Sequence, residues 1–180
     1  MIESQPAGAY EEAVSQLVDL ARGKQRIVAF TGAGISTDSG IPDYRGPQAV
    51  WKTQAPPSLG DFLENQETRR TMWARSKKNY PELAARQPNG GHLALAEMER
   101  LGVLGAVITQ NIDGLHQKAG NSPEHVFELH GASRRVRCVN CGTVFETSAI
   151  WRRLEAGEEI PACEVCGGIL RTATVLFGEP

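Results

Sequence analysis

The amino-acid sequence predicts an α/β fold built on a parallel sheet. Short, continuous apolar runs recur along the chain, and such runs are typical of strands buried on both faces. Stretches with a helical period of apolar residues alternate with them. A Gly-rich loop directly follows the first apolar run. Helices alternating with buried strands favour parallel pairing through helical crossovers.

The elements of the N-terminal half follow from this pattern. A helix is predicted over residues 10–24, and the first strand over 27–30. The mixed stretch 57–81 is expected to be helical, with Trp51 and Trp73 as packing anchors, and a second clear helix is expected over 92–101. The predicted helix 10–24 carries an apolar stripe of Val14, Leu17, Val18 and Ala21.

The C-terminal half adds three strands and a module of different composition. Strands are predicted over 103–109, 126–129 and 174–177. From Arg134 to Arg171 the apolar runs shorten, while Arg, Cys and Gly become more frequent. We therefore expect a small inserted module at 134–171, with residues 1–133 and 172–180 forming the domain that carries the parallel sheet.

Length and charge exclude several classes of protein. The 180 residues predict one domain, or one domain with a small satellite. With 19 Lys and Arg against 21 Asp and Glu, the net charge is −2, which does not favour a nucleic-acid partner or a polybasic membrane surface. The polar N-terminus has no features of a targeting segment, and no apolar run approaches the roughly 20 residues that span a bilayer. A cytoplasmic protein is the expectation.

Two cysteine pairs in the inserted module predict a metal site. Cys138 and Cys141 form one CxxC pair, and Cys163 and Cys166 form a second. In a reducing compartment, two such pairs are the usual sequence form of a structural zinc site. Four thiolates would complete a tetrahedron and leave no position for a reacting water. Four free buried cysteines, or two redox pairs, are the alternatives.

The Gly-rich loop after the first strand indicates a phosphate or dinucleotide site of non-standard form. Its glycines, Gly32 and Gly34, would let the backbone approach a pyrophosphate. The usual dinucleotide fingerprint has a third glycine where this chain has Thr37, so an ordinary strand-to-helix turn is the alternative. Residues 37–46 then combine turn formers with Tyr44 and Arg45, which is typical of a mobile lid over an anionic ligand.

Polar side chains also follow the next two predicted strands. Gln110, Asn111 and Asp113 come after the strand 103–109, where α/β sheets place their ligands. His130 follows the strand 126–129 and has a side chain able to act as a general base near neutral pH. A polar turn capped by Asp113 and Gly114 would explain the first group equally well. The chemistry alone does not separate His130 from a structural histidine, and the other candidates for the base are His92, His116 and His125.

Taken together and in order, these segments resemble the sirtuins, a family of NAD-dependent protein deacylases. The resemblance is carried by residues 32–36 with 40–45, by 109–116, by His130 with Gly131, by the two cysteine pairs, and by 175–179. It covers the chain from about Ala13 to its end. It implies a Rossmann-like NAD-binding domain, incomplete at its C-terminus, with a structural Zn²⁺ module inserted in it.

The resemblance also implies a reaction and the residues that serve it. The acyl oxygen of a modified lysine attacks the ribose carbon of NAD, nicotinamide leaves, and the acyl group ends on ADP-ribose. Asp113 would accept a hydrogen bond from the nicotinamide carboxamide, Asn111 would act near the reacting ribose, and His130 would remove a ribose hydroxyl proton. The implied cofactor contacts are Gly32, Ala33, Gly34, Ile35, Ser36, Ile41, Asp43, Tyr44, Arg45, Gln110, Asn111, Ile112, Asp113 and His130.

The substrate implied by the resemblance is an acyl-lysine protein or peptide. In the family this peptide adds as a strand beside the segment that corresponds to Val175, Phe177, Gly178 and Glu179. Sirtuins that prefer acidic acyl groups carry a Tyr-x-x-Arg pair, of which this chain keeps Arg75 but has Met72 in place of the tyrosine. The surrounding residues resemble most the branch with weak deacetylation, which is linked to ADP-ribosylation and to longer acyl groups.

Three functions follow as hypotheses. The first is an NAD-dependent protein-lysine deacylase, and the second is a protein mono-ADP-ribosyltransferase that uses the same NAD chemistry. The third is an inactive, zinc-stapled fragment, because family members continue past the segment 175–179 with further strands and helices. On that reading, the 180-residue chain is expected to hold zinc, to bind NAD poorly and to expose an unpaired sheet edge.

Overall fold

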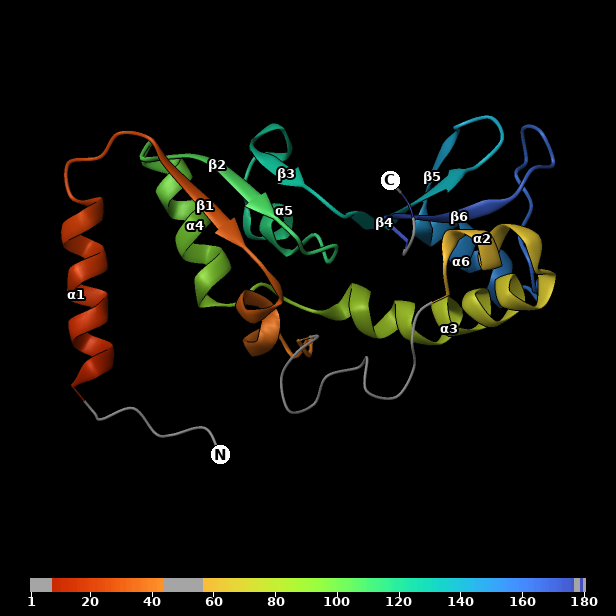
Figure 1. The fold of residues 1–180 in the computed structure, drawn as a ribbon, viewed down its shortest axis with the longest axis horizontal. Coiled ribbons are helices and arrows are strands. Elements are labelled where there is room, and N and C mark those ends of the chain that lie inside the picture. The colour runs from red at the N-terminus through yellow and green to blue at the C-terminus, as the bar shows by residue number, and fades with distance from the viewer. Residues whose placement is uncertain (1–7, 44–56, 177–178, 180) are drawn as a thin grey trace.

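The computed structural model describes residues 8–43, 57–176 and 179. Two small sheets lie at either side of an elongated molecule, with helices below and between them (Figure 1). The predicted α/β fold with a parallel sheet is confirmed. The α-helices are α1 (Ala9–Ala21), α2 (Leu59–Glu64), α3 (Gln66–Ala85), α4 (Gly90–Arg100), α5 (Leu115–Ala119) and α6 (Thr147–Glu155).

The first sheet is parallel and has the strand order β1-β2-β3. Its strands are β1 (Ile27–Thr31), β2 (Leu104–Thr109) and β3 (Val126–Glu128). They lie close to the ranges expected from the sequence. Because the strands are parallel, the segments that follow them all leave the sheet at the same edge.

Only one face of this sheet is covered by the elements that the structure describes. Val107 is fully buried, and Leu95 and Met98 of α4 pack against the cluster to which it belongs. On the opposite face Phe30 is 63% exposed and Phe127 is 54% exposed. The expectation that the first strand is buried on both faces is therefore wrong for the described residues. The apolar stripe of α1 is likewise exposed, and α1 stands away from the sheet (Figure 1).

The second sheet is antiparallel and has the order β5-β4-β6. Its strands are β4 (Gly131–Cys138), β5 (Val144–Glu146) and β6 (Leu170–Thr174). The last strand therefore ends where the sequence pattern placed its beginning, and it pairs with β4 instead of extending the parallel sheet. The helix α6 covers this sheet with Ile150 and Leu154, both buried.

The helix α3 connects the two halves and continues through Pro81 to Ala85, four residues past the expected end. A proline within a helix removes the N–H that would bond to the carbonyl four residues earlier, here that of Lys77. The indole Nε1 of Trp151 on α6 donates to this Lys77 carbonyl at 3.1 Å, and the Trp151 ring lies against that of Tyr80. This contact from the second half satisfies the carbonyl that Pro81 leaves free. Trp73 is buried as expected, whereas Trp51 lies outside the described residues.

The division into a domain of residues 1–133 and 172–180 and a module of 134–171 stays a prediction. The second sheet extends slightly beyond that module, to Gly131 on one side and Thr174 on the other. Among the described helices, none is both long and apolar enough to cross a membrane.

Candidate functional site

The carboxyl ends of the three parallel strands bring the predicted site loops together. Thr31 of β1 lies opposite Thr109 of β2, which lies opposite Glu128 of β3. The ladder continues past the strands, since the backbone N–H of Gln110 donates to Thr31 O at 3.0 Å and that of Leu129 donates to Thr109 O at 2.9 Å. The segments that begin at residues 32, 110 and 129 therefore meet at one edge of the sheet.

The Gly-rich segment forms a short 3₁₀ helix, η1 (Ala33–Ser39), directly after Gly32. The side-chain amide of Asn111 donates to the Gly32 carbonyl and to Ser36 Oγ, each at 3.1 Å, which ties this segment to the loop after β2. A methyl group added at Gly32 or Gly34 would meet no atom within 4 Å. The backbone is thus open to the close approach of a phosphate, as expected for a dinucleotide loop.

The other residues predicted for this part of the site fall into two groups. Ala33, Gly34 and Ile35 lie in η1, Ile41 donates its N–H to Ser36 O at 3.2 Å, and Asp43 is the last described residue of the segment. Tyr44 and Arg45, the predicted lid residues, lie outside the described residues.

The carboxylate of Asp113 is held at both oxygens. Ser36 Oγ donates to Oδ2 at 2.8 Å, and the N–H of Leu115 at the start of α5 donates to Oδ1 at 2.9 Å. Ser36 is itself fully buried. This arrangement fixes the carboxylate beside the Gly-rich segment, and it can still accept further hydrogen bonds because each carboxylate oxygen has two lone pairs.

Two of the other candidates for the general base, His92 and His116, are buried beneath the site residues and are not placed to act as a base. His92 and His116 are both buried, with ring centroids 5.0 Å apart. His92 Nε2 lies 3.5 Å from Ser36 Oγ, and His116 Nε2 lies 2.9 Å from Thr31 Oγ1. Burial, and then the neighbouring His92, lowers the pKa of His116 to about 4, and burial also lowers the pKa of His92. Both rings are therefore neutral packing groups near pH 7.

His130 differs from them because it is exposed and its ring is oriented by the backbone. Its Nδ1 lies 2.9 Å from the carbonyl oxygen of Gln110. A carbonyl only accepts, so Nδ1 carries a proton, and in the neutral ring the free electron pair lies on Nε2. The carbonyl of His130 in turn accepts from the N–H of Val175 at 3.0 Å. The imidazole and the predicted peptide-binding segment are thus joined through one residue.

The residue after His130 has to be glycine. Gly131 has a φ of 75°, a left-handed backbone conformation that residues other than glycine rarely adopt. A Cβ at this position would also collide with the carbonyl oxygen of Ala173 on β6. The close approach of β4 and β6 that this glycine allows keeps His130 beside the segment after β6.

That segment is held by an ion pair between a buried arginine and a partly buried glutamate. Arg171 on β6, only 6% exposed, binds the two carboxylate oxygens of Glu179 at 2.8 and 2.5 Å. Glu179 also accepts from the N–H of Leu176 at 3.1 Å, and the hydrogen bond from Arg171 lowers the pKa of its carboxyl. The predicted substrate residues Val175 and Glu179 are therefore anchored at both ends of this turn. Phe177 and Gly178 lie outside the described residues.

Arg75 lies on α3 and not at the strand ends. It lines a hollow of about 300 Å³ with Pro57, Asn65, Glu67, Thr68, Thr71 and Met72. Its contact with an acyl group stays a prediction.

The four cysteines form a separate cluster in the second sheet. Their sulfur atoms all lie within 4.8 Å of one another, with 3.5 Å between those of Cys138 and Cys166 and 3.7 Å between those of Cys141 and Cys163. A tetrahedral zinc with Zn–S bonds of about 2.3 Å has sulfur–sulfur edges of about 3.8 Å. The cluster therefore fits a structural zinc ion. None of the four cysteines is in a disulfide.

The pKa values of two thiols in this cluster are shifted in opposite directions. Hydrogen bonds from Thr143 lower the pKa of Cys141 to about 6. The backbone of Gly168 acts in the same direction on Cys166, but the neighbouring sulfurs outweigh it and raise the pKa of Cys166 to about 12. A metal that binds here must displace the thiol protons, so its affinity decreases as the pH is lowered.

Sequence reasoning missed Asn89 as part of the site. Its side-chain nitrogen donates to Ile35 O at 2.7 Å and to Ser39 Oγ at 3.0 Å, while its oxygen caps α4 by accepting from Gly91 N–H. It therefore clamps η1 to the start of α4. An asparagine at a helix N-cap is a visible signal, but the second use of its amide needs the tertiary structure.

Comparison with known proteins identifies relatives over nearly the whole chain. The Sir2 family pattern matches residues 32–180. An NAD-dependent protein deacetylase of Thermodesulfovibrio yellowstonii is 42% identical over 172 residues, and one of Saccharolobus solfataricus is 43% identical over 171. The alignments cover 96% and 95% of this chain but 66% of each relative. The chain thus spans slightly less than two thirds of the length of these relatives.

Solved structures show the same similarity. A Sir2 structure with a p53 peptide and NAD⁺ superposes with a TM-score of 0.77 at 36% identity, covering 92% of this chain and 65% of that one. A structure with a deacetylated p53 peptide and 3′-O-acetyl-ADP-ribose gives a TM-score of 0.80 at 36% identity, covering 93% and 66%.

Proposed function

Because the chain belongs to the Sir2 family, we propose that it provides the cofactor loops, general base and zinc module of an NAD-dependent protein-lysine deacylase. The observation that carries the proposal is the position of His130. Its Nδ1 is held by the loop after β2, and its carbonyl holds the segment that starts at Val175. A base, a dinucleotide loop and a peptide-binding segment are thus joined at one sheet edge.

The side chains at this edge suit the parts of NAD. The carboxylate of Asp113 would accept from the NH₂ group of a carboxamide, and Gln110 and Asn111 offer donors and acceptors to ribose hydroxyls. The open backbone at Gly32 and Gly34 would take the pyrophosphate. When bound, NAD would supply a ribose that releases nicotinamide and accepts the acyl group, with one water consumed as the lysine amine is freed.

His130 would act at Nε2. With its proton fixed on Nδ1, the ring can take a proton from a ribose hydroxyl and pass it on, a contribution of roughly 10²–10⁴ in rate. The acyl-lysine peptide would add as a strand beside residues 175–179, with backbone hydrogen bonds supplying affinity and little sequence preference. The relatives with a p53 peptide support this substrate class.

The zinc ion would hold the second sheet and take no part in the reaction, since four thiolates leave no open coordination position. Reduced cysteines of this spacing also favour a cytoplasmic location. We assign residues 134–171 to the zinc module, and residues 1–133 and 172–180 to the NAD-binding domain.

The proposed reaction has a product that no simple hydrolase makes. The protein, with the whole of its natural chain, is incubated with NAD and an acetyl-lysine peptide, and the products are identified by mass spectrometry. We expect nicotinamide and O-acetyl-ADP-ribose in equal amounts. ADP-ribose attached to protein, with the peptide still acetylated, would instead establish the mono-ADP-ribosyltransferase. Release of acetate without cleavage of NAD would exclude both functions.

A further inference from the structure

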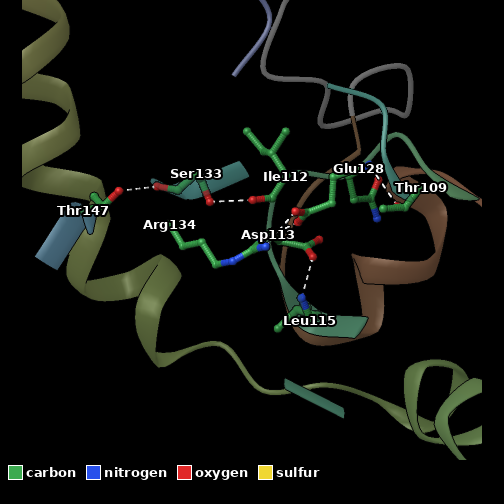
Figure 2. Close-up of polar contacts among 9 residues, drawn as sticks. Thr109, Ile112, Asp113, Leu115, Glu128, Ser133, Arg134 and Thr147 are labelled. Carbon is green, nitrogen blue, oxygen red and sulfur yellow. Dashed lines mark hydrogen bonds and ion pairs between the residues drawn. The ribbon is translucent and has the colours of Figure 1, made fainter. Parts of the chain in front are cut away.

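A short chain of hydrogen bonds joins the second sheet to the loop that carries Asp113 (Figure 2). The carbonyl oxygen of Ile112 accepts two hydrogen bonds from Ser133, one from its N–H at 2.9 Å and one from Oγ at 2.6 Å. The carbonyl of Ser133 then accepts from Oγ1 of Thr147 at 2.7 Å. Thr147 is the first residue of α6 and is buried.

An irregularity in β4 makes this contact possible. The register between β4 and β6 shifts between Ala132 and Val136, which pair with the adjacent residues Ala173 and Thr172. The residues between them on β4 are therefore withdrawn from the ladder with β6, and the N–H of Ser133 turns to Ile112 instead. Strand irregularities of this kind commonly redirect groups near functional sites.

The neighbouring residue joins β4 to the end of β3. Arg134 forms a bidentate ion pair with Glu128 at the end of β3, in which Nη2 donates to Oε2 at 2.7 Å. Its guanidinium also lies over Gly114, where it would be 3.5 Å from an added Cβ. Ser133 thus holds the carbonyl of Ile112, while the next residue, Arg134, ties β4 to the end of β3 (Figure 2).

We propose that Ser133 and Thr147 are positioning residues for the nicotinamide site: together they fix the carbonyl of Ile112 and, through it, the carboxylate of Asp113. This inference rests on the proposed function, because it concerns the affinity for NAD and nicotinamide. Neither side chain is among the cofactor contacts that the resemblance implies. They act by restricting the loop, so that Asp113 need not be ordered when the cofactor binds.

The central test is made in the full-length protein and replaces Thr147. Thr147→Val keeps the shape but removes the hydroxyl donor, and Thr147→Ser keeps the hydroxyl. We expect Thr147→Val to raise the KM for NAD and the half-inhibitory nicotinamide concentration by about threefold to tenfold, as for the loss of one hydrogen bond. The KM for the acyl-lysine peptide should stay within about twofold. Thr147→Ser should restore the parent values.

Two further variants sharpen the test. Ser148→Ala alters the exposed neighbour of Thr147 and should leave all constants unchanged. Ser133→Ala removes one of the two hydrogen bonds to Ile112 and should raise the KM for NAD in the same direction. The double variant of Ser133→Ala with Thr147→Val should be less than additive, because both act through the same carbonyl.

The outcomes separate this inference from the proposed function. If the parent is active and Thr147→Val lowers only the melting temperature, the role of Thr147 is merely structural and the inference is overturned. If the parent neither cleaves NAD nor deacylates, the proposed function fails, and amide hydrogen exchange decides the positioning claim. Exchange at the N–H groups of Ser133 and Leu115 should then be faster in Thr147→Val than in Ser148→Ala, and equal rates would refute it.

Discussion

Nδ1 of His130 lies 2.9 Å from the carbonyl oxygen of Gln110, so the backbone of the loop after β2 orients the ring and places a proton on Nδ1. In the neutral ring the opposite nitrogen, Nε2, carries the electron pair that the proposed general base would use. This relationship distinguishes His130 from the buried His92 and His116, and it underlies the first prediction.

Replacing His130 by Ala should lower deacylation by roughly 10²–10⁴, the usual contribution of a general base. Nicotinamide binding should change little, because Asp113 is held by other residues. Product formation from NAD and an acetyl-lysine peptide measures the effect. His125→Gln is the matched control, since His125 is exposed, paired with Glu99 and placed before β3, at the opposite end of that strand from His130. Full activity of His130→Ala would remove the assigned base.

Gly131→Ala should destabilise the fold by at least about 2 kcal/mol, because it adds both left-handed strain and a collision with the Ala173 carbonyl. Urea unfolding gives the free energy. Gly102→Ala is the control, since Gly102 has a φ of 74° but no atom within 4 Å of an added Cβ. Equal losses in the two variants would show that the collision is relieved.

Removal of zinc should unfold the second sheet. Cys163 is buried in the same cluster as Trp73 and Leu170, so Cys163→Ser should lose the metal and lower the melting temperature. Metal analysis and circular dichroism with and without a chelator check this. Val165→Ser, at an exposed position between the second cysteine pair, should keep one zinc per chain. A purified protein that is folded and free of metal would contradict the prediction.

Acid should destabilise the protein through His116. Its pKa is about 4 in the fold against an ordinary value of 6.5, so the unfolded chain binds the proton more readily. The stability is complete above pH 6.5 and declines as the pH falls toward 4, by up to about 3 kcal/mol. Melting temperatures of the parent and His116→Gln should converge across this range in the presence of excess zinc. A constant difference between them would show that His116 does not titrate in the unfolding equilibrium.

The uncovered face of the first sheet should make the 180-residue chain self-associate. Phe30 and Phe127 lie on this face, and both are register partners of Ile108 on β2. Exposed apolar groups of this kind drive association. Phe30→Lys with Phe127→Lys should lower the apparent mass in analytical ultracentrifugation, whereas Lys at the exposed Val165 should not. A monomeric parent would refute the prediction.

Local patterns were sufficient to predict the three parallel strands, the helix before β2 and the cysteine cluster. Continuous apolar runs and CxxC pairs can be recognised from neighbouring residues alone, without knowledge of long-range contacts. Strand ends also indicated where Asn111, Asp113 and His130 would meet, because parallel strands deliver their following loops to one edge.

The tertiary structure decided what consecutive residues do not encode. Pro81 reads as a helix end, yet α3 continues because Trp151, seventy residues later, bonds to the freed carbonyl. The strand predicted at 174–177 lies at 170–174, because pairing with β4 and not local apolarity sets its limits. The same holds for Ser133 and Thr147, whose hydrogen bonds depend on the irregularity in β4 that brings a strand of one sheet to a loop of the other. The amino-acid sequence by itself determined the parallel strands, the cysteine pairs and the chemistry of the site residues; long-range pairing decided where the other elements end and which of them touch.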